Sequence, residues 1–184
     1  NKKVPFSTDD KVDHPVSLYA ATKKAGEVLC HTYYHLYGIS TACLRLFTVY
    51  GRRQRPDLAI HKFTALISQG KPIPFFGDGS MKRDFTYIDD IIDGIVKALI
   101  WTGRETGYDI FNLGESKAIS LTELVNLLSG ALGKEAIINR LPVPPGDVKQ
   151  TYADISHSKE VLGYNPVMDI KEGIAKFVEW YKSK

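Results

Sequence analysis

Cysteine is scarce in this sequence, with only Cys30 and Cys43 among 184 residues. Neither belongs to a Cys-x-x-Cys pair or to a spaced set of cysteines and histidines, which excludes the common zinc-binding patterns and a disulfide framework. Two isolated thiols in apolar patterns are typical of core residues in a reducing compartment. We therefore expect no metal site and a cytoplasmic protein.

Long apolar runs and strong net charge are also missing. No run of residues approaches the length needed to cross a membrane, and no secretory signal peptide is visible. The formal net charge of +3 is small, and the basic residues are dispersed apart from Arg52-Arg53-Gln54-Arg55. Because a basic stripe is absent, we expect neither a nucleic acid nor a membrane as a partner.

The third absence is a glycine-rich loop. No Gly-x-Gly-x-x-Gly follows a strand pattern, and Gly77-Asp78-Gly79 has neither the third glycine nor the helix that should follow it. Such a loop normally cradles the pyrophosphate of a dinucleotide. The chain also opens at Asn1 without a start methionine, and we expect it to be the later part of a longer protein.

A tyrosine and a lysine four residues apart follow Pro15. Tyr19 and Lys23 project from the same side of a helix, because one helical turn separates positions i and i+4. A free tyrosine has a pKa of about 10, and a nearby ammonium group favours its phenolate. Tyr19 would then be able to take a proton from a sugar or alcohol hydroxyl. The pair alone is weak evidence, because this spacing is common in helices.

Helical and strand patterns alternate along the chain, which predicts an α/β protein. Helices are expected to begin at 17, 58, 89, 120, 156 and 169, and strands to cover 41–47, 73–76, 83–88, 108–113 and 136–141. The first helix is expected to pack on the sheet through an apolar stripe formed by Leu18, Ala21, Ala25, Val28, Leu29, Thr32 and Leu36. Asp89 is expected to cap a helix whose core stripe is formed by Ile91, Ile92, Ile95, Val96 and Leu99.

Several motifs occur in an order that resembles the extended short-chain dehydrogenase/reductase family. They are Leu18-Tyr19-Ala20-Ala21-Thr22-Lys23-Lys24-Ala25-Gly26-Glu27, Leu44-Arg45-Leu46-Phe47-Thr48-Val49-Tyr50-Gly51, Gly77-Asp78-Gly79, Arg83-Asp84-Phe85-Thr86-Tyr87-Ile88-Asp89-Asp90, Phe111-Asn112-Leu113-Gly114 and Pro145-Gly146-Asp147. Within that family the chain is most similar to the NAD-dependent nucleotide-sugar epimerases, in particular those acting on UDP-glucuronate. The match covers the whole chain but only the later part of such an enzyme.

The resemblance implies a fold and a division of the chain. The fold would be the C-terminal part of a Rossmann-type doubly wound parallel sheet plus the smaller α/β substrate-binding lobe. Residues 1–58 would form the end of the NAD-binding Rossmann lobe and carry the catalytic helix. Residues 59–184 would belong mainly to the sugar-nucleotide lobe, interleaved with the Rossmann lobe around 83–112.

The resemblance also implies a reaction with NAD as the cofactor. Tyr19 would remove the proton of the sugar C4 hydroxyl while a hydride passes from C4 to NAD, and Lys23 would make Tyr19 basic and hydrogen-bond the nicotinamide ribose. The 4-keto sugar would then turn its other face to the cofactor, so that C4 is inverted. Phe47 and Val49, which follow a strand, are expected to contact the cofactor together with Tyr19 and Lys23.

Five residues are assigned to the substrate by the same resemblance: Thr48, Arg55, Phe76, Arg83 and Asp147. Thr48 and Arg55 would hold the carboxylate of a uronic acid, although Arg55 also fits a solvated basic loop. Phe76 would lie near the uracil and Arg83 at the diphosphate, where a surface ion pair is the alternative for Arg83. Asp147 would border the ribose and diphosphate in a proline-rich turn that lacks the arginine usual in the family.

Other activities use the same motifs and stay open. They are those of UDP-glucose and UDP-N-acetylglucosamine epimerases, nucleotide-sugar dehydratases and UDP-glucuronate decarboxylases. A non-catalytic alternative is an inactive fragment that only binds a UDP-sugar, which the missing glycine loop favours for the isolated chain. Family members often form homodimers through the catalytic helix and the next helix, which here would involve Val28, Tyr33, Leu36 and the face of 58–69.

Overall fold

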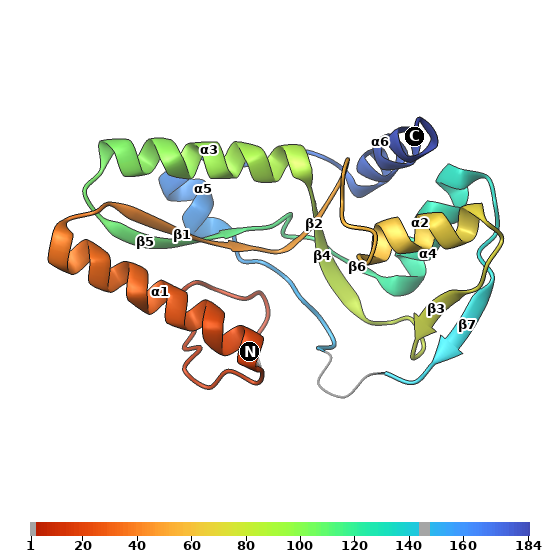
Figure 1. Ribbon diagram of the computed structural model, residues 1–184, viewed down its shortest axis with the longest axis horizontal. Coiled ribbons are helices and arrows are strands. Elements are labelled where there is room, and N and C mark those ends of the chain that lie inside the picture. The colour runs from red at the N-terminus through yellow and green to blue at the C-terminus, as the bar shows by residue number, and fades with distance from the viewer. Residues whose placement is uncertain (1–2, 144–147) are drawn as a thin grey trace.

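The structure is a computed structural model that describes residues 3–143 and 148–184. Its helices and strands alternate, as predicted for an α/β protein (Figure 1). The described helices are α1 (Leu18–Tyr37), α2 (Ala59–Ser68), α3 (Ile88–Arg104), α4 (Leu121–Leu132), α5 (Ser156–Leu162) and α6 (Ile170–Lys182). The described strands are β1 (Thr41–Leu46), β2 (Thr48–Tyr50), β3 (Ile73–Phe76), β4 (Lys82–Tyr87), β5 (Tyr108–Leu113), β6 (Ala118–Ser120) and β7 (Ile138–Leu141).

The described strands pair as three small sheets. β1 and β5 are parallel, with Thr41 opposite Tyr108 and Leu46 opposite Leu113. β4 pairs in parallel with β2 and antiparallel with β6, while β3 pairs in parallel with β7. In Figure 1, α1 covers one face of the β1–β5 pair and α3 covers the other. Helices on both faces of a parallel sheet are the layering of a doubly wound α/β fold.

The buried apolar side chains form two clusters, one in each half of the molecule. The larger cluster packs α2, α4 and α6 against β3 and β4 and includes Ile60, Leu128 and Phe177. The smaller cluster lies between α3, β5 and α5 and includes Leu113 and Tyr164. Each cluster removes its own apolar surface from water, so each half of the molecule has an apolar core of its own.

Capping residues fix several helix boundaries where the sequence predicts them. The Ser17 hydroxyl accepts a hydrogen bond from the N–H of Ala20 at 3.1 Å and begins α1, which ends at Gly38 with φ 65°. The Ser120 hydroxyl accepts from the N–H of Glu123 at 3.1 Å and begins α4. An oxygen acceptor at the start and a left-handed glycine at the end satisfy backbone groups that the helix itself leaves unpaired.

The predicted packing side of α1 is wrong. Leu18, Leu29 and Leu36 are 88%, 60% and 62% exposed, so the apolar stripe faces away from the sheet. The side that meets β1 carries Glu27, whose carboxylate pairs with Arg45 at 2.7 Å. A half-buried arginine inside a strand requires a partner, and this polar requirement overrides the apolar pattern of the helix.

The stripe predicted for α3 is only partly buried. Ile91 is 1% exposed, whereas Ile92 is 49% and Leu99 is 70% exposed. The predicted cap at Asp89 is also wrong, because the helix begins directly after Tyr87 without a side-chain cap and Asp89 lies in its first turn. Despite these outward apolar residues, none of the described helices has the length and apolar character that crossing a bilayer requires.

The chain changes sheet at Phe47. The predicted strand 41–47 ends as β1 at Leu46, and a second strand, β2, which was not predicted, begins at Thr48. Val49 packs against the smaller apolar cluster, while Tyr50 belongs to the larger one. β2 therefore connects the two halves of the molecule, and a strand of three residues carries too little pattern to be recognised in the sequence.

Candidate active site

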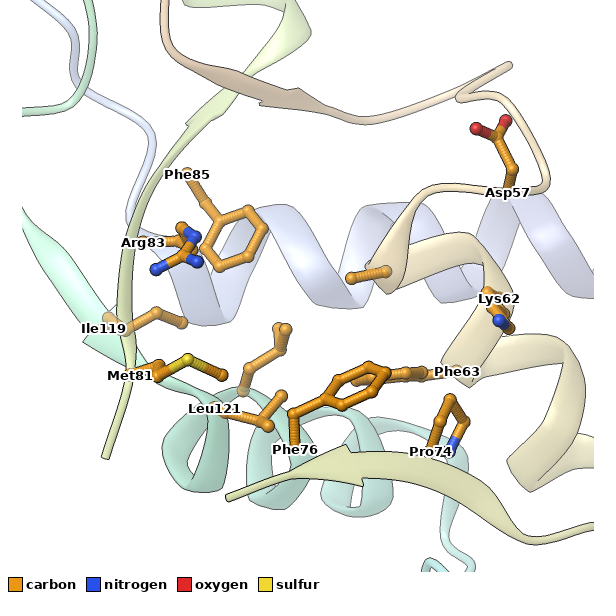
Figure 2. Close-up of a pocket in the computed structure, with 12 residues that line it drawn as sticks. Asp57, Lys62, Phe63, Pro74, Phe76, Met81, Arg83, Phe85, Ile119 and Leu121 are labelled. Carbon is orange, nitrogen blue, oxygen red and sulfur yellow. The ribbon is translucent and has the colours of Figure 1, made fainter. Parts of the chain in front are cut away.

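A cavity of about 230 Å³ opens between α2, β3, β4 and the start of α4 (Figure 2). Most of its wall is apolar, and three charged side chains are present. The lining consists of Asp57, Ala59, Lys62, Phe63, Pro74, Phe76, Met81, Arg83, Phe85, Ile119, Leu121 and Leu124. An apolar wall with a few charged groups is the usual form of a small-molecule site.

Phe76 and Arg83, both predicted to bind the substrate, lie in this cavity. Figure 2 shows the ring of Phe76 directed toward its middle and Arg83 entering from β4 near Phe85. Arg83 Nη1 also donates a hydrogen bond to the carbonyl of Lys82 at 2.9 Å. An aromatic face suits a nucleobase and a guanidinium suits a phosphate. The structure thus brings the two residues together, and their binding roles stay predictions.

Tyr19 and Lys23 share one side of α1, as their spacing predicts. The Lys23 Nζ atom lies 5.3 Å from the centroid of the Tyr19 ring. Tyr19 is 72% exposed, so its hydroxyl is open to a ligand rather than sunk in packing. Neither Tyr19 nor Lys23 belongs to the described residues that line the cavity. They form a separate reactive pair on the first turns of the helix.

Arg55 forms an ion pair with Asp57, a residue of the cavity wall. Its Nε and Nη2 atoms donate to the two carboxylate oxygens of Asp57 at 3.0 and 2.6 Å. Hydrogen bonding and charge from Asp57 raise the pKa of Arg55, and Tyr19 raises it further through electrostatic interaction. Asp57 lines the cavity. Arg55 itself does not line the cavity, but it is paired with a residue of the cavity wall.

The three residues after β1 occupy different surroundings. Phe47 is half-buried, with its ring centroid 6.4 Å from that of Phe6. Thr48 lies opposite Phe85 in the β2–β4 ladder, so it is one strand away from the cavity wall. Val49 packs on the smaller apolar cluster, and its carbonyl accepts a hydrogen bond at 2.9 Å from Gln54. Packing accounts for Phe47 and Val49, and their predicted cofactor contacts stay predictions.

Two charged residues of the cavity wall were missed by the sequence analysis, and one predicted residue cannot be placed. Asp57 and Lys62 line the cavity but were not predicted. The available signal for Asp57 was its position two residues after Arg55, which allows the fork of one side chain to meet the carboxylate of the other. Asp147 lies outside the described residues. In residues 3–143 and 148–184, no group of three or more metal-ligating side chains gathers in one place.

The residues present fit one end of a bound NAD. Tyr19 and Lys23 are both exposed, and an ammonium beside a phenol suits a ribose and a reacting hydroxyl. For the other end of the dinucleotide, the sequence supplies no glycine-rich loop. The cofactor-binding roles of Tyr19 and Lys23 stay predictions, and the sequence contains none of the usual cradle for the pyrophosphate.

The class of protein follows from comparison with family models. Residues 1–114 match the NAD dependent epimerase/dehydratase family. The match begins before the Tyr19–Lys23 pair and ends at Gly114, just after β5. The chain belongs to this family.

Among curated relatives, the chain is similar to UDP-glucuronate 4-epimerases. It is 46% identical over 197 residues to UDP-glucuronate 4-epimerase 1 of Arabidopsis thaliana, a match that covers 100% of this chain and 46% of the relative. It is 40% identical to the probable UDP-glucuronate 4-epimerase of Rhizobium meliloti, covering 98% of this chain and 58% of the relative. The chain thus spans about half the length of these relatives.

Solved structures confirm the predicted fold class. The UDP-glucuronic acid 4-epimerase of Bacillus cereus, in complex with UDP-glucuronic acid and NAD, matches with a TM-score of 0.88 and 38% identity, over 98% of this chain and 57% of that chain. The UDP-N-acetylglucosamine 4-epimerase of Methanobrevibacter ruminantium matches with a TM-score of 0.90 and 27% identity, over 100% of this chain and 59% of that one. The chain therefore has the α/β architecture of the Rossmann-like epimerases.

Proposed function

We propose that this protein, at its natural length, is an NAD-dependent epimerase that inverts C4 of a UDP-sugar and converts UDP-glucuronate to UDP-galacturonate. The observation that carries the proposal is the exposed Tyr19–Lys23 pair on α1. The 46% identity to an Arabidopsis thaliana UDP-glucuronate 4-epimerase supports the choice of substrate. The Bacillus cereus enzyme bound to UDP-glucuronic acid and NAD supports it as well.

Tyr19 would handle the proton of the C4 hydroxyl. Its phenol is exposed, and the Lys23 ammonium lies over its ring, so a group that can exchange a proton and a positive charge are held side by side. Lys23 would also hold the nicotinamide ribose, with Phe47 and Val49 at the same side of the cofactor. When bound, NAD supplies the oxidation and the reduction at C4. The chain itself supplies proton transfer and orientation.

The carboxylate of the sugar would be held by Arg55 and Thr48. A 4-keto sugar with a carboxylate at C5 is a β-keto acid, which loses carbon dioxide easily unless the carboxylate is kept in an unfavourable orientation. A guanidinium has five N–H donors, and Asp57 accepts from Nε and Nη2 only. The remaining donors of Arg55 can bind a second carboxylate, and a positioned carboxylate distinguishes an epimerase from a decarboxylase.

The nucleotide would occupy the cavity. Phe76 would lie against the uracil and Arg83 would meet the diphosphate, with Asp147 near the ribose. The apolar wall around Phe63 and Phe85 excludes water from the base. UDP-N-acetylglucosamine 4-epimerisation is the second candidate, because a 4-epimerase for that sugar shares the fold over the whole chain with a TM-score of 0.90.

The activity is tested with the protein at its natural length and a panel of UDP-sugars. We expect conversion of UDP-glucuronate to UDP-galacturonate without net change in NAD, measured by chromatography of the products. Loss of carbon dioxide as the main outcome would assign the protein to the decarboxylases. Faster conversion of UDP-N-acetylglucosamine would favour the second candidate.

Calorimetry on residues 1–184 tests the binding part of the proposal. UDP-glucuronate is expected to bind, because the nucleotide cavity lies within these residues. NAD is expected to bind weakly or not at all, because the glycine-rich loop is absent from the sequence. Binding of NAD without binding of UDP-glucuronate would contradict the assignment of the cavity to the nucleotide and the need for a glycine-rich loop.

The proposal extends to assembly and location. Val28 and Leu36 on the outward side of α1 are 56% and 62% exposed, and such an apolar stripe on a surface helix suits pairing with a second copy. The corresponding side of α2 is not available, because Ile60 and Phe63 are buried in the larger apolar cluster. We propose a homodimer through α1 in the cytoplasm, where UDP-sugars and reduced thiols coexist.

A further inference from the structure

The helix that carries Tyr19 and Lys23 has no fully buried apolar side chain. All residues of α1 are described, and none of them is fully buried. Its large aliphatic side chains point away from the sheet, with Leu29 60% and Leu36 62% exposed. Apolar burial is the usual force that holds a helix on a sheet. Another interaction must therefore fix the position of α1 against β1 and β5.

Arg45 on β1 provides that interaction through Glu27 on α1. Arg45 Nε donates to Glu27 Oε1 at 2.7 Å and Arg45 Nη2 donates to Glu27 Oε2 at 3.0 Å. The side chains are only 23% and 12% exposed. Burial alone would raise the pKa of Glu27, but the hydrogen bonds and charges of Arg45 and Lys24 hold that pKa below its usual range. A two-point pair of planar groups fixes orientation as well as distance.

A second contact grips the backbone of the same residue. Tyr108 Oη, from β5, donates to the carbonyl of Glu27 at 3.0 Å. The ring of Tyr108 also packs edge-on against His31, one turn further along α1, with centroids 5.0 Å apart. Glu27 is thus held at its side chain from β1 and at its backbone from β5. This clasp, formed by Arg45, Glu27 and Tyr108, resists both rolling and sliding of the helix.

Because Glu27 and Tyr19 belong to the same helix, the position of Glu27 determines the position of Tyr19. Tyr19, Lys23 and Glu27 are spaced by four residues and form one row along α1. Eight residues correspond to about 12 Å along the helix axis. A tilt of about 5° at the clasp would therefore move Tyr19 by about 1 Å, and a displacement of that size is enough to lower a reaction rate about 100-fold.

We infer that Arg45 is a positioning residue for catalysis: through its paired bonds to Glu27 it sets the roll and tilt of α1, and thereby where the Tyr19 hydroxyl and the Lys23 ammonium meet the sugar. The inference rests on the proposed function. The nucleotide cavity packs with the larger apolar cluster, whereas β1 and β5 belong to the other half. Arg45 should therefore influence turnover without influencing how tightly the nucleotide is held.

The kinetic test uses the protein at its natural length with NAD and UDP-glucuronate. Arg45→Met is expected to lower kcat about 10- to 100-fold while KM stays within about 2-fold of the wild type. Arg45→Lys keeps the charge but loses the fork, and is expected to restore only part of kcat. Tyr108→Phe removes one hydroxyl and is expected to lower kcat by less than Arg45→Met. Arg104→Met, at the exposed end of α3, is the matched control with unchanged kcat.

Hydrogen exchange on residues 1–184 gives a readout that does not depend on activity. Arg45→Met is expected to speed amide exchange in α1 and to leave α2 and α4 unchanged, because those helices pack in the larger cluster. Full kcat in Arg45→Met or Arg45→Lys, or a rise in KM that matches the fall in kcat, would overturn the inference. A wild type that is inactive on every UDP-sugar would defeat the proposed function, while the exchange result would still decide whether the clasp holds α1.

Discussion

Two buried side-chain oxygen atoms have no hydrogen-bond partner among the described residues. They are the hydroxyl oxygen of Tyr50 and the Oε2 atom of Glu115. Burial raises the pKa of Glu115 to about 7, and the charge of Asp90 adds to this effect, together with Asp84 and Asp169, while Lys117 opposes it. Burial and the charge of Glu115 also raise the pKa of Tyr50. Glu115 is thus a carboxyl group that titrates near neutral pH.

Glu115→Gln is expected to change how stability depends on pH. The folded-state pKa of Glu115, about 7, lies above its ordinary value of 4.5, so the folded state binds the proton more tightly than the unfolded state. Glu115 therefore makes the wild type lose stability as pH rises from about 4.5 to about 7. Since Glu115 is only half-buried, we expect the unfolding free energy of the wild type to fall by about 1–2 kcal/mol over this pH range.

Urea unfolding at pH 5 and pH 8 measures this effect. The difference in unfolding free energy between Glu115→Gln and the wild type is expected to favour the variant more at pH 8 than at pH 5. Glu135→Gln, at an exposed glutamate, is the control and is expected to show no such difference. A parallel pH dependence in Glu115→Gln and the wild type would contradict the assignment.

Arg55→Ala is expected to separate uronate from neutral sugars. A hydrogen bond to a charged group contributes about 1.5–3 kcal/mol, which corresponds to a loss of about 10- to 100-fold in kcat/KM on UDP-glucuronate. UDP-glucose lacks the carboxylate, so its kcat/KM is expected to change by less than about 3-fold. Lys71→Ala, an exposed lysine after α2, serves as the control. Equal losses of kcat/KM on UDP-glucuronate and UDP-glucose would show that Arg55 does not recognise the carboxylate.

At the scale of elements, the contact of α6 with β2 depends on a glycine. A Cβ atom added at Gly173 in α6 would collide with the hydroxyl and ring of Tyr50 on β2. Gly130 in α4, in contrast, has open space at its Cβ position. Close packing of a helix against a buried tyrosine therefore requires the missing side chain at Gly173 and not at Gly130.

Gly173→Ala and Gly130→Ala are expected to change stability in opposite directions. Overpacking at Gly173 costs about 1–3 kcal/mol, which exceeds the gain of about 1 kcal/mol from replacing glycine by alanine in a helix. Gly130→Ala receives only that gain. Thermal unfolding of both variants measures the difference, and a Gly173→Ala variant as stable as the wild type would show that Tyr50 can move aside.

Most element boundaries could be predicted because their signals are local. Ser120 followed by Glu123 predicts the start of α4, and β5 was predicted at its observed bounds. The side of α1 that packs on the sheet could not be predicted, because it depends on Arg45 pairing with Glu27, eighteen residues earlier in the chain. Periodicity finds an apolar stripe but does not tell whether the molecule or a partner covers it.

Some of the residues that line the cavity could be predicted and others could not. Arg83 belongs to a motif and Phe76 directly precedes one, and both line one cavity. Lys62 and Glu115 carry no motif, since their importance comes from neighbours that only folding brings together. Tertiary burial and tertiary charge are the two quantities that the sequence alone did not provide.

At the scale of the whole molecule, two apolar cores divide the chain in an interleaved way. The smaller core includes β5 (Tyr108–Leu113). In the sequence, β5 follows α2 (Ala59–Ser68), which is the first helix of the larger core. The expected interleaving around 83–112 and the expected boundary at residue 58 both stay predictions. Relative movement of the two cores would change the distance between Tyr19 and the cavity.

Self-association is the property of the whole molecule that the exposed side of α1 predicts. The double variant Leu29→Lys with Leu36→Lys is expected to weaken association, because two charges would enter an apolar contact. Light scattering at several concentrations measures the change toward a monomer of 20.6 kDa. Leu99→Lys on α3 is the control, being 70% exposed but on the other face of the sheet. Equal effects of both changes would count against a dimer through α1.

The single residue between β1 and β2 limits how this chain can vary through evolution. Since side chains alternate in a strand, inserting or deleting one residue at Phe47 would exchange the directions of Thr48 and Val49 relative to β4. Length changes should therefore be rejected by natural selection at this crossing and accumulate in surface segments such as 105–107, where backbone shifts leave both cores intact.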